Sequence, residues 1–267
     1  MAMEEKAAIG AGYTVVGLVV RIAVYTAITF IATVLLVVET PATGGYFNLG
    51  EASIYAIAAI APPLATAIAA GLGPALADLV LGYWYFAPAT FAIKFTEGFV
   101  VSYLMRRLPG RISLRLRALT AGLGLALALV VSVNGLGGAG GGFGAELAMV
   151  NASLAGLGLV IPSLVISAPA ALWLVISLLI AILSLSLAVI SARRPYMLAM
   201  AVGGLIMVTG YFLYEYFFSN PIILHRDPAG AFFEIPVNIG QFVAGILLSY
   251  PVVHFVARAG AAVSERP

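Results

Sequence analysis

A chain of 267 residues in which 63% are hydrophobic and only 9% are charged differs from soluble globular domains, where about 25% of the residues are charged. The formal net charge of +2 is too small to indicate a nucleic-acid partner, and without cysteine the chain has no disulfide or thiolate metal site. Long uncharged runs recur from end to end and do not alternate as the strands of a membrane barrel do. We therefore predict an all-α polytopic membrane protein.

Eight apolar segments are expected to cross the membrane. In chain order they are residues 22–38, 52–61, 64–81, 90–104, 118–133, 170–190, 197–218 and 231–255. Pro62 and Pro63 mark a turn between the second and third spans. Loops are expected at 39–50 and at the aromatic run 82–88, which suits a membrane interface. Residues 1–20 open with charged side chains and are assigned no span of their own.

The arginines give the expected orientation. In an eight-span bundle, the dense basic cluster at 106–117, the pair at 193–194, Arg258 and Arg266 all lie on one side. Because cytoplasmic loops carry such an excess, we expect both termini in the cytoplasm and the chain in the cell membrane. A ninth crossing at residues 145–166 would put the pair at 193–194 on the wrong side, so this segment is expected to be an outer lid or a re-entrant piece.

A polar stripe lies on the last, otherwise apolar span. Glu234, Asn238 and Gln241 stand at i, i+4 and i+7, within about a 60° arc of one helical face. A carboxylate at the bilayer centre costs roughly 2.5–3.5 kcal/mol, so it should face a protein interior or a cavity. The stripe therefore indicates a polar centre inside the bundle.

Two other spans carry similar stripes. Thr90, Lys94 and Glu97 repeat the i, i+4, i+7 spacing, and Tyr211 and Glu215 stand four residues apart. In the expected orientation, all three stripes lie in the outer halves of their helices at roughly one depth. We interpret their common centre as a solute-binding site.

Structural interpretations of the same residues stay open. Lys94 and Glu97 form either a structural ion pair or part of a preorganised polar pocket, and Asp78 is expected to pair with Lys94 in a structural role. Asn238 and Gln241 are either ligand contacts or hydrogen-bonding links between helices.

Five strings give the chain a family likeness. They are residues 41–51 (PATGGYFNLGE), 71–78 (GLGPALAD), 87–94 (APATFAIK), 210–215 (GYFLYE) and 234–241 (EIPVNIGQ). In this order they resemble the S components, the substrate-binding membrane subunits, of energy-coupling factor (ECF) vitamin transporters of the riboflavin type. The likeness covers about residues 21–110 and 195–257, which implies a six-helix core within a single membrane domain, 1–267. Residues 113–193 depart from that pattern and are expected to be an insertion that adds two spans.

The resemblance implies a subunit that captures a small water-soluble vitamin or vitamin precursor from outside the cell. It also implies delivery by docking to a transmembrane coupling subunit that carries two ATPase subunits. Ala23 and Ala27, four apart in the first span, match the docking surface of the family. The residues expected to bind substrate are Tyr46, Phe47, Asn48, Tyr85, Thr90, Lys94, Glu97, Tyr211, Glu215, Glu234, Asn238 and Gln241.

Aromatic and charged residues at the site suggest the kind of ligand. Tyr46, Phe47 and Tyr85 either belong to an interfacial aromatic belt or form a lid and stacking wall for a flat heterocycle. Lys94 is the one cation expected at this depth, against three glutamates. Either burial protonates some carboxyl groups or the ligand brings positive charge, which favours a cationic or amine-bearing heterocycle such as a thiamin-like compound.

Two other functions remain as alternatives. A self-sufficient secondary transporter could couple to protons through Glu97 or Glu234. An intramembrane enzyme using these acids or His254 is less expected, because no activated nucleophile is visible. His225 and His254 are expected on opposite sides of the membrane, which argues against a shared metal site. We also expect no cofactor and no enzymatic activity.

Overall fold

Eight α-helices make up most of this computed structural model. It describes residues 2–40, 44–108, 112–137, 145–149, 152–154, 159–160, 164–168, 170–192 and 194–264. The helices are α1 (Ala2–Leu35), α2 (Gly50–Ile60), α3 (Pro63–Leu81), α4 (Ala87–Arg107), α5 (Leu114–Gly137), α6 (Ala170–Ile190), α7 (Pro195–Tyr214) and α8 (Ala231–Ser264). A π-helix, η2 (Glu215–Ile223), continues α7, and a 3₁₀-helix, η3 (Pro228–Gly230), precedes α8.

Each of the eight predicted spans overlaps one of these helices, and the predicted all-α membrane fold is confirmed. Five helical stretches are long and apolar enough to cross a membrane, and they are Val15–Leu35, Pro63–Leu81, Leu114–Val133, Pro195–Ile223 and Pro228–Ala259. Two shorter apolar helices are Gly50–Ile60 and Ser177–Ile190. The remaining helix, α4, is long enough but carries Lys94 and Glu97 along its length. The turn at Pro62 and Pro63 also forms, because Pro63 begins α3 as its first residue.

The first helix differs from its prediction at both ends. The sequence predicts a span over 22–38 and none over 1–20, whereas α1 is one continuous helix from Ala2 to Leu35. No proline interrupts residues 1–35, so nothing breaks the hydrogen-bond ladder. Beyond Leu35, the β-branched pair Val37 and Val38 leaves the helix and enters a strand.

Short strands gather at one end of the bundle. The predicted loop 39–50 contains a hairpin of β1 (Val37–Thr40) and β2 (Gly45–Phe47), and residues 41–43 lie outside the described residues. The predicted lid, 145–166, enters β3 (Ala145–Met149), β4 (Ala152–Leu154), β5 (Leu159–Val160) and β6 (Leu164–Ala168). β4 pairs antiparallel with β1, with Val38 opposite Ala152. The described part of this segment is therefore extended and adds strands to the first hairpin.

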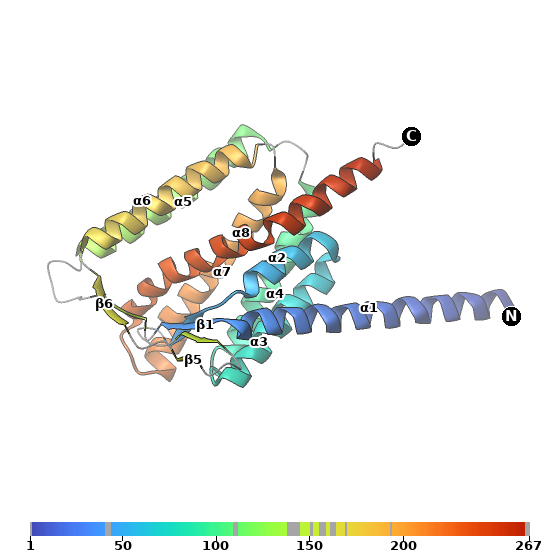
Figure 1. The fold of residues 1–267 in the computed structure, drawn as a ribbon, viewed down its shortest axis with the longest axis horizontal. Helices are drawn as coiled ribbons and strands as arrows, with labels where there is room; N and C mark the ends of the chain where they lie inside the picture. The colour runs from blue at the N-terminus through green and yellow to red at the C-terminus, as the bar shows by residue number, and fades with distance from the viewer. Residues whose placement is uncertain are drawn as a thin grey trace.

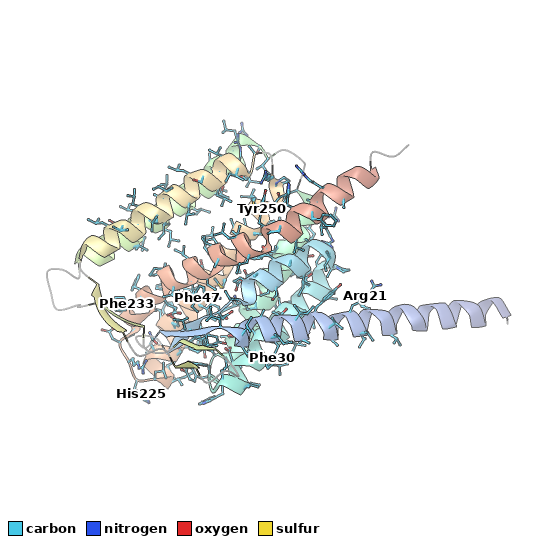
Figure 2. The ribbon with its side chains drawn as sticks, in the orientation of Figure 1. Arg21, Phe30, Phe47, His225, Phe233 and Tyr250 are labelled. Atoms are coloured by element: carbon cyan, nitrogen blue, oxygen red, sulfur yellow. The ribbon has the colours of Figure 1, made fainter. Side chains whose placement is uncertain are left out.

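Both chain termini lie at the end of the bundle opposite the strands, as Figure 1 shows. The predicted arginines follow this polarity, because Arg107 ends α4, Arg115 lies in the first turn of α5 and Arg194 precedes α7. Figure 2 labels His225 near the strand end. The two ends of the bundle therefore differ in charge, with the arginine excess at the end of the termini.

α3 packs tightly between α1 and α4 through small residues. A Cβ on Gly73 would lie 2.8 Å from Thr29 Cβ and 2.9 Å from the Phe30 backbone nitrogen. On the other side, a Cβ on Gly98 of α4 would lie 2.7 Å from Ala70 Cβ. Such small residues let transmembrane helices approach closely, so van der Waals packing replaces the hydrophobic effect that the bilayer does not supply. This three-helix contact holds the first hairpin over α3 and α4.

Gly73→Ala is expected to destabilise the protein by about 1–3 kcal/mol, because the new methyl group meets the backbone of α1. Gly122→Ala is the matched control, since nothing lies within 4 Å of a Cβ at that helical position. Unfolding of both variants in the same detergent measures the difference. Equal stability of the two variants would contradict the close α1–α3 contact.

Candidate functional site

A small cavity lies beneath the first hairpin at the strand end of the bundle. Its volume is about 30 Å³. It is lined by Gly45, Tyr46, Asn48, Pro74, Asp78, Phe86, Thr90, Tyr211, Glu215, Glu234, Asn238 and Gln241. Eight of these twelve residues are among those that the sequence analysis expects to bind substrate. The three predicted polar stripes therefore do contribute to one cavity.

The stripe on α8 faces this cavity as its spacing predicts. Glu234, Asn238 and Gln241 are at most 4% exposed and all line it. Across the cavity, α4 contributes Thr90 and α7 contributes Tyr211, whose hydroxyl donates to Thr90 Oγ1 at 3.1 Å. This hydrogen bond ties α4 to α7 across more than a hundred residues of sequence, opposite the stripe on α8.

Glu215 reaches the cavity from a π-helical turn. The sequence predicts one continuous α-helix over 197–218, but the α-helix ends at Tyr214 and η2 begins at Glu215. π-Helical turns are rare and frequently lie at functional sites. Glu215 is 1% exposed, and its Oε2 atom has no hydrogen-bond partner among the described residues. This carboxylate oxygen is available to a donor group placed in the cavity.

Lys94 and Glu97 lie beneath the cavity and do not line it. The Lys94 ammonium pairs with Glu51 and also with Glu97 Oε2 at 3.4 Å. The Tyr55 hydroxyl donates to Glu97 Oε1 at 3.0 Å. All four side chains are at most 2% exposed. We name Glu51, Tyr55, Lys94 and Glu97 the ion cluster, and its geometry favours the structural interpretation of Lys94 and Glu97.

The expected pair between Asp78 and Lys94 is wrong. Within the described part of the chain, Asp78 Oδ1 instead accepts a 2.5 Å hydrogen bond from the Tyr46 hydroxyl. Lys94 already has two carboxylate partners on α2 and α4. Asp78 is consequently a wall of the cavity and an anchor for the first hairpin.

Gln241 connects the ion cluster to the cavity. Its Nε2 donates to Glu51 Oε1 at 3.3 Å, and its Oε1 accepts from the Asn48 backbone nitrogen at 3.1 Å. Asn48 Oδ1 in turn accepts from the Gly50 nitrogen at 2.8 Å, at the start of α2. The Gln241 side chain therefore fixes the end of the first loop, α2 and α8 relative to one another.

Aromatic side chains fasten the first hairpin over the cavity. The Tyr46 ring lies 4.7 Å from that of Tyr83, and its hydroxyl reaches Asp78. Burial, with the adjacent Asp78 carboxylate, raises the pKa of Tyr46, so this phenol stays protonated and keeps donating. Tyr85 donates to the Gly44 carbonyl at 3.1 Å and accepts, through its own carbonyl, a hydrogen bond from Tyr214.

Four residues expected to bind substrate do not line the cavity. Lys94 and Glu97 belong to the ion cluster, Tyr85 holds the hairpin from outside, and Phe47 of β2, labelled in Figure 2, is half-buried beside the lining residue Tyr46.

The sequence analysis also missed several residues of the site. Asp78, which was assigned a structural role, and Glu51 were within its reach, because each is an acid beside a long apolar segment. Gly45, Pro74 and Phe86 carry no such signal, because glycine, proline and phenylalanine are common throughout this chain. The described residues contain no cluster of histidine and acids suited to a metal ion.

Lys94→Met is expected to destabilise the fold by about 3–5 kcal/mol, because it leaves Glu51 and Glu97 buried without a cation. Adding Glu51→Gln to the same chain should restore part of the loss. Thermal unfolding of the single and double variants measures the coupling. A Lys94→Met protein as stable as the parent would contradict the structural role of the ion cluster.

The chain was compared with known proteins. A family model described as "ECF-type riboflavin transporter, S component" matches residues 14–166. An "Uncharacterized protein in gap 3'region" from Pyrococcus woesei is 40% identical over 76 residues, which are 28% of this chain and 51% of that protein. The chain therefore matches about half the length of this curated relative. No solved structure matches it.

The family match begins at residue 14 and extends through most of the segment 113–193. The division of the chain into a six-helix core and an insertion at 113–193 stays a prediction. The matched region contains α2, α3 and α4 with the first hairpin, and thus the ion cluster and half of the cavity wall. S components are transport subunits and not enzymes, so the intramembrane enzyme is set aside. As the five strings suggested, the chain belongs to the ECF-type riboflavin transporter S component family.

Proposed function

We propose that this chain captures a small water-soluble vitamin or vitamin precursor in the cavity beneath the first hairpin. The observation that carries the proposal is the convergence of polar side chains from α3, α4, α7, η2 and α8 on that cavity. Polar residues within membrane segments are costly and mark substrate pathways. A structural role alone does not account for Glu215, whose buried Oε2 lacks a hydrogen-bond partner within the part of the chain that the structure describes.

The charge of the cavity supports an amine-bearing or cationic ligand. Asp78, Glu215 and Glu234 line it, whereas no lysine or arginine does so among the described residues. The Lys94 ammonium pairs with two carboxylates of the ion cluster and lies 5.6 Å from the ring of the lining residue Tyr211, so it does not pair directly with the acids of the lining. A thiamin-like heterocycle suits three acids better than a neutral flavin does, although the family description names riboflavin.

Entry of such a ligand requires the first hairpin to move. Small-molecule pockets usually enclose about 300–1,000 Å³, while this cavity measures about 30 Å³. Two side-chain hydrogen bonds are expected to break first, from Tyr46 to Asp78 and from Tyr85 to Gly44. Each of them joins the hairpin to a loop or to the end of a helix. We expect capture to follow release of these contacts.

Delivery is proposed to use the exposed face of α1. Ala23 and Ala27 both lie on that face, away from α3. The coupling subunit with its two ATPases would dock there. The termini would lie in the cytoplasm, at the arginine-rich end, and the cavity would open outside. The division into a six-helix core and an inserted pair, α5 and α6, is part of this proposal.

Glu215→Gln is expected to weaken binding of a cationic vitamin by about tenfold or more, since a hydrogen bond to a charged group contributes about 1.5–3 kcal/mol. Asp227→Asn is the matched control, because this exposed acid caps η3 at the same end and does not line the cavity. Equilibrium binding of a vitamin panel to the purified chain measures both variants. No binding of any vitamin by the parent chain would overturn the proposal.

Ala27→Trp is expected to abolish assembly with the coupling complex and to leave vitamin affinity within about twofold, because the side chain is exposed and far from the cavity. Val80→Trp, on the exposed face of α3, serves as the control. Co-purification with the coupling complex reports docking. Uptake in cells that lack the coupling ATPases, collapsed by an uncoupler, would instead favour the proton-coupled transporter.

A further inference from the structure

A second cavity lies between the α5–α6 pair and the pair α7 and α8. Its volume is about 190 Å³. Leu127, Leu183, Leu187, Met197, Phe242 and Val243 are among the residues that line it. The lining residue Ile180 and its neighbour Ala128 belong to one buried apolar cluster with Met207 and Ile235, so the two pairs also pack against each other beside the cavity.

The walls of this cavity present hydrocarbon. Two of its hydroxyl side chains bond to their own helices. Ser184 donates to the Ile180 carbonyl at 2.7 Å, and Thr120 donates to the Arg117 carbonyl at 2.9 Å. Along α6 the lining runs from Ile180 to Ile190, a length of about 15 Å at 1.5 Å per residue. The cavity thus suits a long apolar group.

Two arginines lie at the end of the cavity nearer the termini. Arg117, one turn before the lining residue Thr120, donates through Nη1 to the Ala188 carbonyl at 3.3 Å. Its buried Nε atom has no hydrogen-bond partner among the residues that the structure describes. Arg194, three residues before the lining residue Met197, has its guanidinium 5.2 Å from the centre of the Tyr250 ring, which Figure 2 labels.

The Arg194 side chain is held in place by an aromatic stack. The Tyr250 ring stacks on His254 at 5.3 Å, and the Tyr196 hydroxyl bonds to His254 Nδ1 at 2.8 Å. A guanidinium fixed over an aromatic ring keeps its remaining N–H groups free to bind an anion in a forked geometry. The cavity therefore combines an apolar length with a cationic end.

We propose that the second cavity binds an anionic phospholipid, with one acyl chain between α6 and α8 and the phosphate at Arg117 and Arg194. At this depth the bilayer supplies hydrocarbon, which contacts the apolar walls, whereas water finds no hydrogen-bond partners there. Basic pockets between transmembrane helices bind anionic lipid headgroups on the cytoplasmic side. The lipid then joins the α5–α6 pair to α7 and α8, whichever vitamin the chain carries.

The test uses the full chain in nanodiscs made from equal parts of phosphatidylglycerol and phosphatidylcholine with identical acyl chains. Native mass spectrometry after release is expected to show bound phosphatidylglycerol enriched over phosphatidylcholine. Arg117→Gln with Arg194→Gln should lower that enrichment about tenfold, the order expected for losing two charges near an anionic headgroup. Val243→Trp, which fills the cavity, should remove both lipids.

Matched controls separate this site from general effects. Arg107→Gln removes a cation at the same end that lies over Tyr103 rather than at the cavity, and it should change nothing. Leu248→Trp adds the same bulk on an exposed position of α8 outside the lining and should also change nothing. Inorganic phosphate should not compete. Equal retention of the two lipids by the parent chain, or equal losses in Arg107→Gln and the double variant, would overturn the proposal. A third outcome would also overturn the proposal: a folded Val243→Trp protein that retains both lipids but no longer assembles with its coupling complex. In that case a helix of a partner protein, and not a lipid, would occupy the cavity.

Discussion

The position of Lys94 between Glu51 and Glu97 is the constraint on which this structure depends. Three buried ionisable side chains carry a large desolvation cost when they are charged, and their mutual contacts together with the hydroxyl of Tyr55 offset part of it. These contacts fix α2 against α4. Since Gln241 bonds to Glu51, the same arrangement also fixes α8 and the end of the first loop. The cavity rests on this layer, so its inner wall is positioned before any solute arrives, whereas the hairpin above it is the part that is expected to move.

The ion cluster also explains why the charged residues near the cavity have different roles. The cation pairs with acids below the cavity, whereas Asp78, Glu215 and Glu234 are the charged residues among the described lining. A site of this kind selects by charge and hydrogen bonding more than by apolar area. The hairpin above supplies the aromatic surface, and its fastening through Tyr46 and Tyr85 links access to recognition.

Much of the helical framework could be predicted from the sequence, because apolar length and proline positions decide where spans begin and end. The stripe of Glu234, Asn238 and Gln241 was also predictable, since 3.6 residues per turn place the three on one face. The depth of each side chain along a helical face could not be predicted in this way. Lys94 and Thr90 share a stripe, yet one is buried in the ion cluster and the other lines the cavity, because a four-residue step moves about 6 Å along the axis. Strand pairing between residues 37–38 and 152–153 joins distant segments, which no local pattern reveals.

The π-helical turn at Glu215 has a consequence for relatives of this protein. Each residue of a helix turns the chain by about 100°, so losing one residue just before this acid would swing it off the cavity wall with no substitution at all. Relatives that keep every motif but differ in length here would then present another side chain to the solute. Solute preference within such a group can therefore diverge through an insertion or deletion, even where all aligned residues are identical.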